Sequence, residues 1–155
     1  MTNTQARTQS VNRILTLDSR LVSSAMEVYN SCTEDKIPIY ICAGYRSNEE
    51  QAWMYDIGRF TPGATLTNDR PKYSANNYGM GLDFCLRMES VNRLINWQEA
   101  DMTDYWRTLW MKVVRRFESE GWECGWRNSV GLFEPGHARN LLGKDIGELL
   151  TAADD

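Results

Sequence analysis

Short strand-like segments alternate with helical segments along this chain, and no strand-like segment is long. Residues 36–43 and 80–88 are rich in β-branched, aromatic and other apolar residues, which is typical of strands. Residues 104–120 instead repeat large apolar side chains at helical spacing. Doubly wound parallel sheets need long apolar strands, and the chain has neither these nor a G-x-G-x-x-G turn. We therefore predict an α+β fold in which a small, mainly antiparallel sheet is flanked by helices.

Residues that favour helix starts precede the helical segments. Asp18, Ser47 and either Thr103 or Asp104 can accept a hydrogen bond from a free backbone amide of the first turn. Gly121 then provides a stop for the longest apolar stripe. The predicted helices cover residues 18–32, 47–58, 103–120 and 144–150, and a further strand is predicted at 122–126.

The size and composition of the chain suit one globular domain. It has 155 residues, and its 42% content of hydrophobic residues is enough to form a core. Because no repeat or low-complexity tract divides the sequence, we expect a polar arm at residues 1–13 and a single domain at residues 14–155. No run of 18 apolar residues occurs, and the polar start lacks the apolar stretch of a signal peptide. We expect the protein to be made in the cytoplasm.

The charge balance disfavours nucleic acid as a partner. The chain carries 17 Lys and Arg against 21 Asp and Glu, which gives a formal charge of -4 at pH 7. Proteins that bind phosphate backbones concentrate basic residues instead.

The cysteines show no pattern that by itself identifies a site. They are Cys32, Cys42, Cys85 and Cys124, and no two form a C-x-x-C pair. Buried thiols are the favoured interpretation, with a disulfide or a metal-ligand role left open. Strand alternation places Cys85 on the same face as Asp83 and opposite Phe84.

Several polar residues stand where a purely structural role is hard to assign. Arg46 follows the first strand, and Glu134 and His137 lie in a stretch rich in Gly and Pro. His137 is the single histidine of the chain. Asp83 lies inside an apolar strand, where a carboxylate is costly unless it is paired, hydrogen-bonded or bound to a metal. We therefore predict that Asp83 has a partner.

Five segments occur in the order typical of one enzyme family. They are AGYRSNEEQ (43–51), GRFTPGATLTN (58–68), YSANNYGMGLDF (73–84), GWECGW (121–126) and FEPGH (133–137). With these segments the chain resembles the zinc peptidases that trim bacterial peptidoglycan. This family includes D-alanyl-D-alanine carboxypeptidases and phage L-alanyl-D-glutamate endolysins, and it belongs with lysostaphin-type enzymes and the hedgehog signalling domain. The resemblance covers residues 14–139 and implies the hedgehog/D-Ala-D-Ala-peptidase type of α+β fold.

The resemblance also implies a zinc cofactor and its ligands. Asp83 falls on the zinc-binding aspartate, and His137 falls on the last zinc-binding histidine. Glu134 falls on the carboxylate of the D/E-x-x-H pair, which acts as general base. In such sites zinc lowers the pKa of a bound water and a nearby carboxylate takes its proton.

The same resemblance assigns three residues to the substrate. Arg46 falls on the arginine that holds a substrate carbonyl or carboxylate, and would steady the charge that develops on the cleaved amide. Ser74 opens the metal motif, and Tyr78 follows it within the same segment. Both are expected to bind substrate. Because the segments look most like those of the endolysins, the L-alanyl-D-glutamate bond is the first choice of substrate.

One position departs from the family pattern. Asn76 stands where the first zinc-binding histidine belongs, seven residues before Asp83. An amide oxygen is a poor zinc ligand, so the change is expected to weaken metal binding. Three interpretations stay open: weak zinc binding by Asp83 and His137 with help from Cys85, a peptidase fold kept for binding or structure, or an engineered inactivating change.

The sequence thus predicts a phage-type peptidoglycan peptidase that hydrolyses an amide of the peptide stem with the help of zinc. The alternative is a catalytically impaired peptidase fold that serves as a structural or wall-binding component of a phage particle. The expected partners are peptidoglycan and other virion proteins. The expected place of action is the cell wall, reached after lysis or on a virion.

Overall fold

The computed structural model describes residues 1–125 and 135–153, and its centre is one antiparallel sheet. The strands found in these residues are β1 (Ile39–Ala43), β2 (Gly81–Met88), β3 (Arg93–Ile95), β4 (Glu123–Cys124) and β5 (His137–Arg139). Their order is β1-β2-β5-β4, and β3 pairs with the far end of β2. Every pair is antiparallel, so the predicted α+β fold with a small antiparallel sheet is confirmed.

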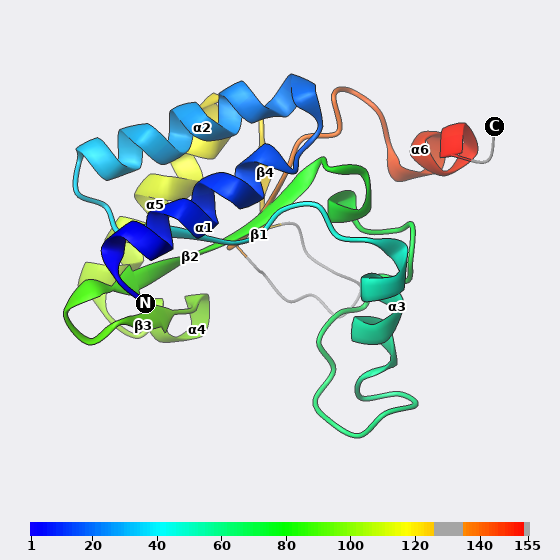
Figure 1. Cartoon of the computed structure of the whole chain (residues 1–155), viewed down its shortest axis with the longest axis horizontal. Coiled ribbons are helices and arrows are strands. Elements are labelled where there is room, and N and C mark those ends of the chain that lie inside the picture. The colour runs from blue at the N-terminus through cyan, green and yellow to red at the C-terminus, as the bar shows by residue number, and fades with distance from the viewer. Residues whose placement is uncertain (126–134, 154–155) are drawn as a thin grey trace.

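Helices cover the sheet, as Figure 1 shows. The helical segments of the described residues are α1 (Asn3–Leu15), α2 (Ser19–Glu34), α3 (Asn48–Asp56), η1 (Ala75–Tyr78), η2 (Glu89–Val91), α4 (Trp97–Ala100), α5 (Asp104–Ser119) and α6 (Ile146–Ala153). Asp18 and Ser47 cap α2 and α3 as predicted, and of the two candidates for α5 it is Thr103 that caps the helix. Helix α1 packs on β1, and α2 packs on α1, β1 and α5.

The core lies between these helices and one face of β2. Phe84 in β2 contacts Trp110 and Phe117 of α5, with ring centroids 5.2 and 5.6 Å apart. All three rings are buried, and burying a side chain of this size contributes about 2–3 kcal/mol. Because alternate side chains of a strand point to opposite faces, Asp83 and Cys85 lie on the other face.

Residues 3–13, which we predicted to be part of a polar arm, belong to helix α1. Thr2 caps the helix, and its buried face consists of Ala6, Ser10 and Ile14. The Ser10 hydroxyl accepts a hydrogen bond from a β1 backbone amide at 3.1 Å. Two small residues and one isoleucine give a weak apolar stripe, which explains why the sequence pattern does not indicate this helix.

The chain between α3 and η1 is a long loop that folds back onto α3. The Arg59 guanidinium donates to the Thr67 carbonyl at 3.0 Å and lies 3.8 Å from the centroid of the Tyr55 ring. This loop therefore has a defined path beside α3, which forms the lower right part of Figure 1.

The strand predicted at 122–126 falls partly outside the described residues, because Trp126 is not among them. Within residues 122–125, Glu123–Cys124 form β4. Strand β5 has three residues, too few to show an alternating pattern. It nevertheless carries His137 into the sheet.

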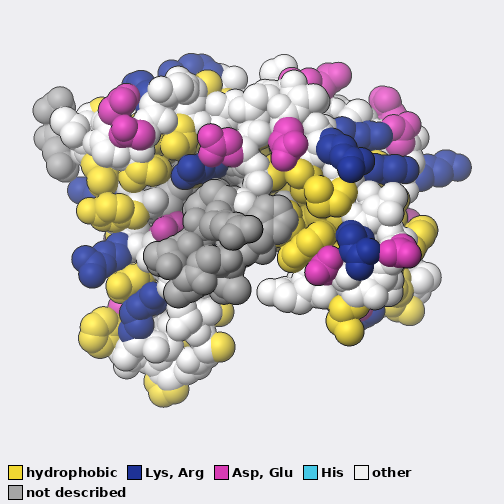
Figure 2. All heavy atoms as spheres, turned by 180° about the vertical axis from the view of Figure 1, so that it is seen from behind, with side chains coloured by type: hydrophobic (Ala, Val, Ile, Leu, Met, Phe, Trp, Pro, Cys, Tyr) yellow, Lys and Arg dark blue, Asp and Glu magenta, His cyan; other side chains and the backbone are white. Residues whose placement is uncertain are grey.

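The described surface mixes charges of both signs. On the face in Figure 2, acidic and basic side chains are interspersed, in keeping with a net charge of only -4. Among the described residues, no helix combines the length and the apolar character needed to cross a bilayer.

Candidate active site

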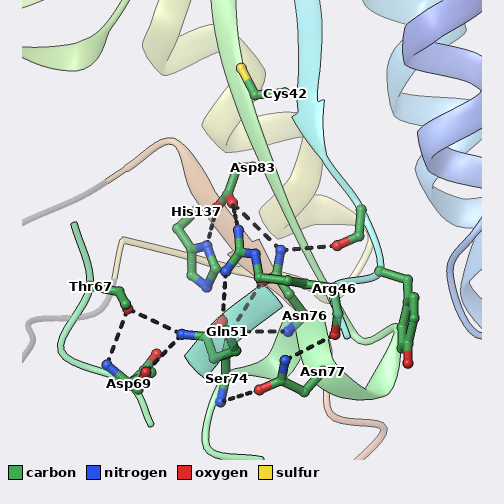
Figure 3. A network of polar contacts seen from close by, with 12 residues as sticks. Cys42, Arg46, Gln51, Thr67, Asp69, Ser74, Asn76, Asn77, Asp83 and His137 are labelled. Carbon is green, nitrogen blue, oxygen red and sulfur yellow. Dashed lines mark hydrogen bonds and ion pairs between the residues drawn. The ribbon is translucent and has the colours of Figure 1, made fainter. Parts of the chain in front are cut away.

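Asp83 lies where three parts of the chain meet. In the sheet it pairs with Ala43 of β1 on one side and with His137 of β5 on the other. Directly opposite residues of antiparallel strands point to the same face, so the register brings the His137 side chain to Asp83. Nδ1 of His137 contacts Oδ1 of Asp83, as Figure 3 shows.

Two further groups contact the other carboxylate oxygen of Asp83. Arg46 Nη2 donates to Oδ2 at 3.0 Å, and Asn76 Nδ2 donates to the same oxygen at 3.5 Å. Burial pushes the pKa of Asp83 upward, but His137 and Arg46 outweigh it and hold this pKa below its ordinary value. Asp83 therefore has the partners that its place in an apolar strand requires.

Arg46 is held on its other side by Gln51. Arg46 Nη1 donates to Oε1 of Gln51 at 3.0 Å, and Gln51 is fully buried in α3. The Gln51 amide nitrogen in turn donates to the Asp69 carbonyl oxygen at 2.7 Å. The guanidinium is thus oriented by α3 and the following loop, with one nitrogen directed at Asp83. Gln51 could not be singled out from the sequence, because one glutamine in a polar helix gives no sign of burial.

Asn76 is a buried residue of this site. It is fully buried, and its amide nitrogen donates to the Gly44 carbonyl at 3.1 Å as well as facing Asp83. Its amide oxygen instead accepts from the Ser74 hydroxyl at 3.4 Å. Gly81 makes room for this oxygen, because a Cβ at Gly81 would lie 2.7 Å from it. The asparagine and the glycine therefore fit one another.

Ser74 and Tyr78, which the resemblance assigns to the substrate, shape the backbone beside the site. The buried Ser74 hydroxyl caps η1 by accepting from the Asn76 amide at 3.3 Å. The Tyr78 hydroxyl donates to the Lys72 carbonyl at 2.8 Å. Ser74 thus joins the Asp83 cluster through Asn76, and substrate binding by Ser74 and Tyr78 stays a prediction.

A second carboxylate, Asp69, lies within electrostatic reach of the cluster. Burial raises the pKa of Asp69, and the charges of His137, Arg139 and Arg46 oppose this shift. Asp69 comes from the loop before η1. No sequence motif indicated it as a residue of the site. Only the folding of this loop over α3 brings it to the site.

The donors that the resemblance assigns to zinc are partly assembled. Asp83 and His137 are in contact, while Asn76 turns its amide nitrogen, not its oxygen, toward Asp83. Within residues 1–125 and 135–153, no three His, Cys, Asp or Glu side chains converge in a way that could hold a metal. A catalytic zinc site uses three protein ligands and a water, and these residues supply two. The described donors therefore do not fit a complete zinc site, and we assign no step to zinc.

The predicted general base cannot be placed in this geometry, because Glu134 lies outside the described residues. Its role stays a prediction. His137, three residues later, shows only that this segment returns to the sheet beside Asp83.

Cys85, whose help in zinc binding stays a prediction, contacts a second cysteine in the structure. Its thiol accepts from the Cys42 thiol, with the two sulfurs 2.9 Å apart, and it joins no group of three potential metal ligands in the described part of the chain. Each of the four cysteines is a free thiol. The neighbouring thiol and burial raise the pKa of Cys42.

Comparison with known sequences supports the resemblance. No family model matches the chain. Over 90 residues it is 33% identical to the peptidoglycan L-alanyl-D-glutamate endopeptidase CwlK of Bacillus subtilis, a stretch that covers 57% of this chain and 53% of that protein. The chain thus matches about half the length of this curated relative.

Solved structures show the same fold at low identity. The L-Ala D-Glu endopeptidase ChiX of Serratia marcescens superposes with a TM-score of 0.54 at 17% identity, covering 84% of this chain and 85% of that one. A variant of the vancomycin-resistance D,D-pentapeptidase VanY in complex with Zn(II) gives a TM-score of 0.56 at 13% identity, covering 86% and 83%. The predicted resemblance to peptidoglycan zinc peptidases is therefore confirmed, in sequence by the Bacillus subtilis endopeptidase and in fold by these structures.

Proposed function

We propose that this chain acts on the peptide stem of bacterial peptidoglycan and recognises the region of the L-alanyl-D-glutamate bond. The similarity to a peptidase named for that bond supports the choice of substrate. Because the match covers about half of that relative, the proposal also rests on the geometry of the candidate site in this chain.

The single observation that carries the proposal is the oriented guanidinium of Arg46. It is buried, and Gln51 and Asp83 hold its two terminal nitrogens at 3.0 Å each. A planar guanidinium presents its donors in a fixed fork that matches a carboxylate or a peptide carbonyl. Asp83 is its present partner, and a stem peptide brings carboxylates and carbonyls of the same kind.

Recognition without cleavage is a second candidate, and Asn76 favours it. This buried residue replaces a zinc ligand, and its oxygen is engaged by Ser74. Hydrolysis in this family type depends on zinc, which the described donors do not complete. In favour of hydrolysis, Arg46, Asp83, Glu134 and His137 all persist in the chain.

A single experiment addresses both candidates with purified sacculi. Sedimentation with insoluble peptidoglycan measures binding, release of soluble fragments measures hydrolysis, and elemental analysis measures zinc per chain. We expect the unchanged protein to bind sacculi and Arg46→Ala to weaken binding at least about 10-fold. If the unchanged protein does not bind sacculi, the proposal is wrong.

The variant Asn76→His separates the two candidates. Restoring an imidazole is expected to raise zinc affinity by at least about 10-fold, since even partners of zinc ligands commonly contribute that much. If the unchanged protein lyses sacculi and Glu134→Ala abolishes this lysis, the protein is a hydrolase. Binding without lysis and without zinc would identify a binding protein.

A phage setting is part of the proposal. It rests on the likeness of the sequence segments to endolysins, and it places the protein at the cell wall after lysis or on a virion, with other virion proteins as partners. Detection of the chain in purified particles or only in lysates would distinguish these two settings.

A further inference from the structure

Two thiols face each other across the strands that carry the candidate site. Cys42 belongs to β1 and Cys85 to β2, and their sulfur atoms are 2.9 Å apart. Cys85 is buried and Cys42 is partly exposed. Neither residue has a role in the recognition proposed above.

A β-bulge creates this contact. The pairing of β1 with β2 passes from Ile41 opposite Phe84 directly to Ala43 opposite Asp83, so Cys42 is the extra residue of β1. A bulge turns a side chain away from the direction that strict alternation would give it. Here it directs Cys42 to Cys85, on the face of β2 that also carries Asp83.

The positions of the two sulfur atoms suit a covalent bond between these residues. In the register Cys85 lies opposite Tyr40, and the bulge brings the Cys42 sulfur to 2.9 Å from the Cys85 sulfur, compared with about 2.0 Å in a disulfide. The sulfurs are already in contact, so a bond would require only a small change of side-chain torsions.

We propose that Cys42 and Cys85 form a reversible disulfide that links β1 to β2 beside the Arg46–Asp83 ion pair. The oxidant is a second disulfide, carried by a small molecule or by another protein. This inference does not depend on the proposed function, since it concerns only the chain's own thiols.

The reaction is a pair of thiol–disulfide exchanges. The more exposed Cys42 loses its proton to solvent, attacks the oxidant disulfide and releases one thiolate, which takes up a proton. Cys85 then loses its proton and attacks the Cys42 sulfur of the mixed disulfide, which releases the second thiol. Two cysteine thiols are oxidised, one disulfide is reduced to two thiols, and the two protons lost are the two regained.

The link would restrain the segment that leads to the site. Arg46 lies four residues after Cys42, and its backbone amide donates to the Asn76 carbonyl at 3.0 Å. Tying the bulge to β2 shortens the free length of chain on this side of Arg46. Oxidation is therefore expected to reduce opening of the 42–46 segment.

The test equilibrates the full chain with glutathione buffers from reducing to oxidising, then unfolds it in denaturant at low pH and blocks the free thiols with a maleimide. We expect reactive thiols to fall from four to two, the intact mass to fall by two hydrogen atoms, and peptide mapping to join Cys42 to Cys85. A midpoint of thermal unfolding raised by about 5 °C or more, and slower hydrogen exchange over residues 42–46, would accompany the link.

Four variants make the test specific. Cys42→Ser and Cys85→Ala should each abolish the link, while Cys32→Ser and Cys124→Ser should leave it unchanged, because these cysteines belong to α2 and β4. Cys42 that carries a stable glutathione with no second exchange would overturn the proposal. So would a link that involves Cys32 or Cys124, or four reactive thiols under the most oxidising buffer.

Discussion

Arg46 and Arg87 are both buried arginines beside the sheet, but their guanidinium groups have different partners. Arg46 contacts the carboxylate of Asp83 and the amide oxygen of Gln51. Arg87, at the end of β2, donates to the carbonyl of Met1 at 2.7 Å. It also donates to the side-chain oxygens of Asn3 and Asn92, at 2.6 and 3.1 Å.

This difference separates a candidate functional residue from a structural one. The hydrogen bonds described for Arg87 go to neutral oxygens of the N-terminus and of a turn, so its charge joins chain segments. Arg46 instead shares its charge with a carboxylate that also contacts a histidine. Burial alone therefore does not mark a functional arginine, and the chemistry of its partners does.

Arg46→Ala is expected to have the largest effect. It leaves Asp83 without a guanidinium in a largely buried position, and breaking such pairs costs about 3–5 kcal/mol when burial is complete. Because 28% of the Asp83 side chain is exposed, we expect a loss of about 2–3 kcal/mol in the free energy of unfolding. Urea unfolding measures this value, and Arg46→Lys is the control that keeps the charge but loses the fork.

Arg87→Ala should affect stability alone. Loss of a charged donor from several neutral oxygens is expected to lower the free energy of unfolding by about 2 kcal/mol. Binding to sacculi should stay unchanged within error, because Arg87 contacts none of Asp83, Asn76 or His137 in the described structure. Equal weakening of sacculi binding by both arginine variants would remove the distinction between them.

Gly81→Ala tests how closely Gly81 packs against Asn76 beside Arg46. A Cβ there would lie 2.7 Å from Oδ1 of Asn76, so we expect a loss of about 1–2 kcal/mol from overpacking. The cost should shrink when Asn76→Ala is already present, since the clashing oxygen is then gone. A double-mutant cycle by urea unfolding measures this coupling, and strictly additive effects would contradict the proposed fit.

Asp18→Ala should have the smallest effect. It measures the contribution of an exposed ion pair with arginine, for comparison with the largely buried pair of Arg46 and Asp83. Asp18 caps α2 and pairs with the exposed Arg20 at 2.9 Å, and the hydrogen bond from Arg20 lowers the pKa of Asp18 to about 2. Loss of the cap is expected to cost about 1 kcal/mol at pH 7.

The pH dependence of this variant follows from the sign of that shift. Because the folded-state pKa is depressed, the contribution of Asp18 is present above its ordinary pKa of 3.8 and is lost as the pH falls toward about 2. The difference in unfolding free energy between Asp18→Ala and the unchanged chain should therefore narrow from pH 5 to pH 2. A constant difference over this range would mean that the ionised carboxylate of Asp18 does not stabilise the folded chain.

The elements with strong periodicity were predictable from the sequence. Helices α2 and α5 each bury a clear apolar face and begin at a side chain that caps them, and strand β2 is a mostly buried apolar run. Helix α1 and strand β5 were not, because Ala6, Ser10 and a three-residue strand leave no periodic signal. The sequence itself singled out Arg46, Asp83 and His137, and the family resemblance assigned their roles, but neither indicated Gln51 or Asp69.

By itself the sequence determined the α+β class, the main helices and the need for a partner at Asp83, because these depend on side-chain periodicity and on the cost of burying a lone charge. Only the tertiary structure decided which groups meet that charge. The register of β2 between β1 and β5 brings His137 to it, and the fold of α3 and its loop orients Arg46 through Gln51. Such contacts join residues far apart in the chain, so their geometry depends on strand pairing and packing that no local pattern encodes.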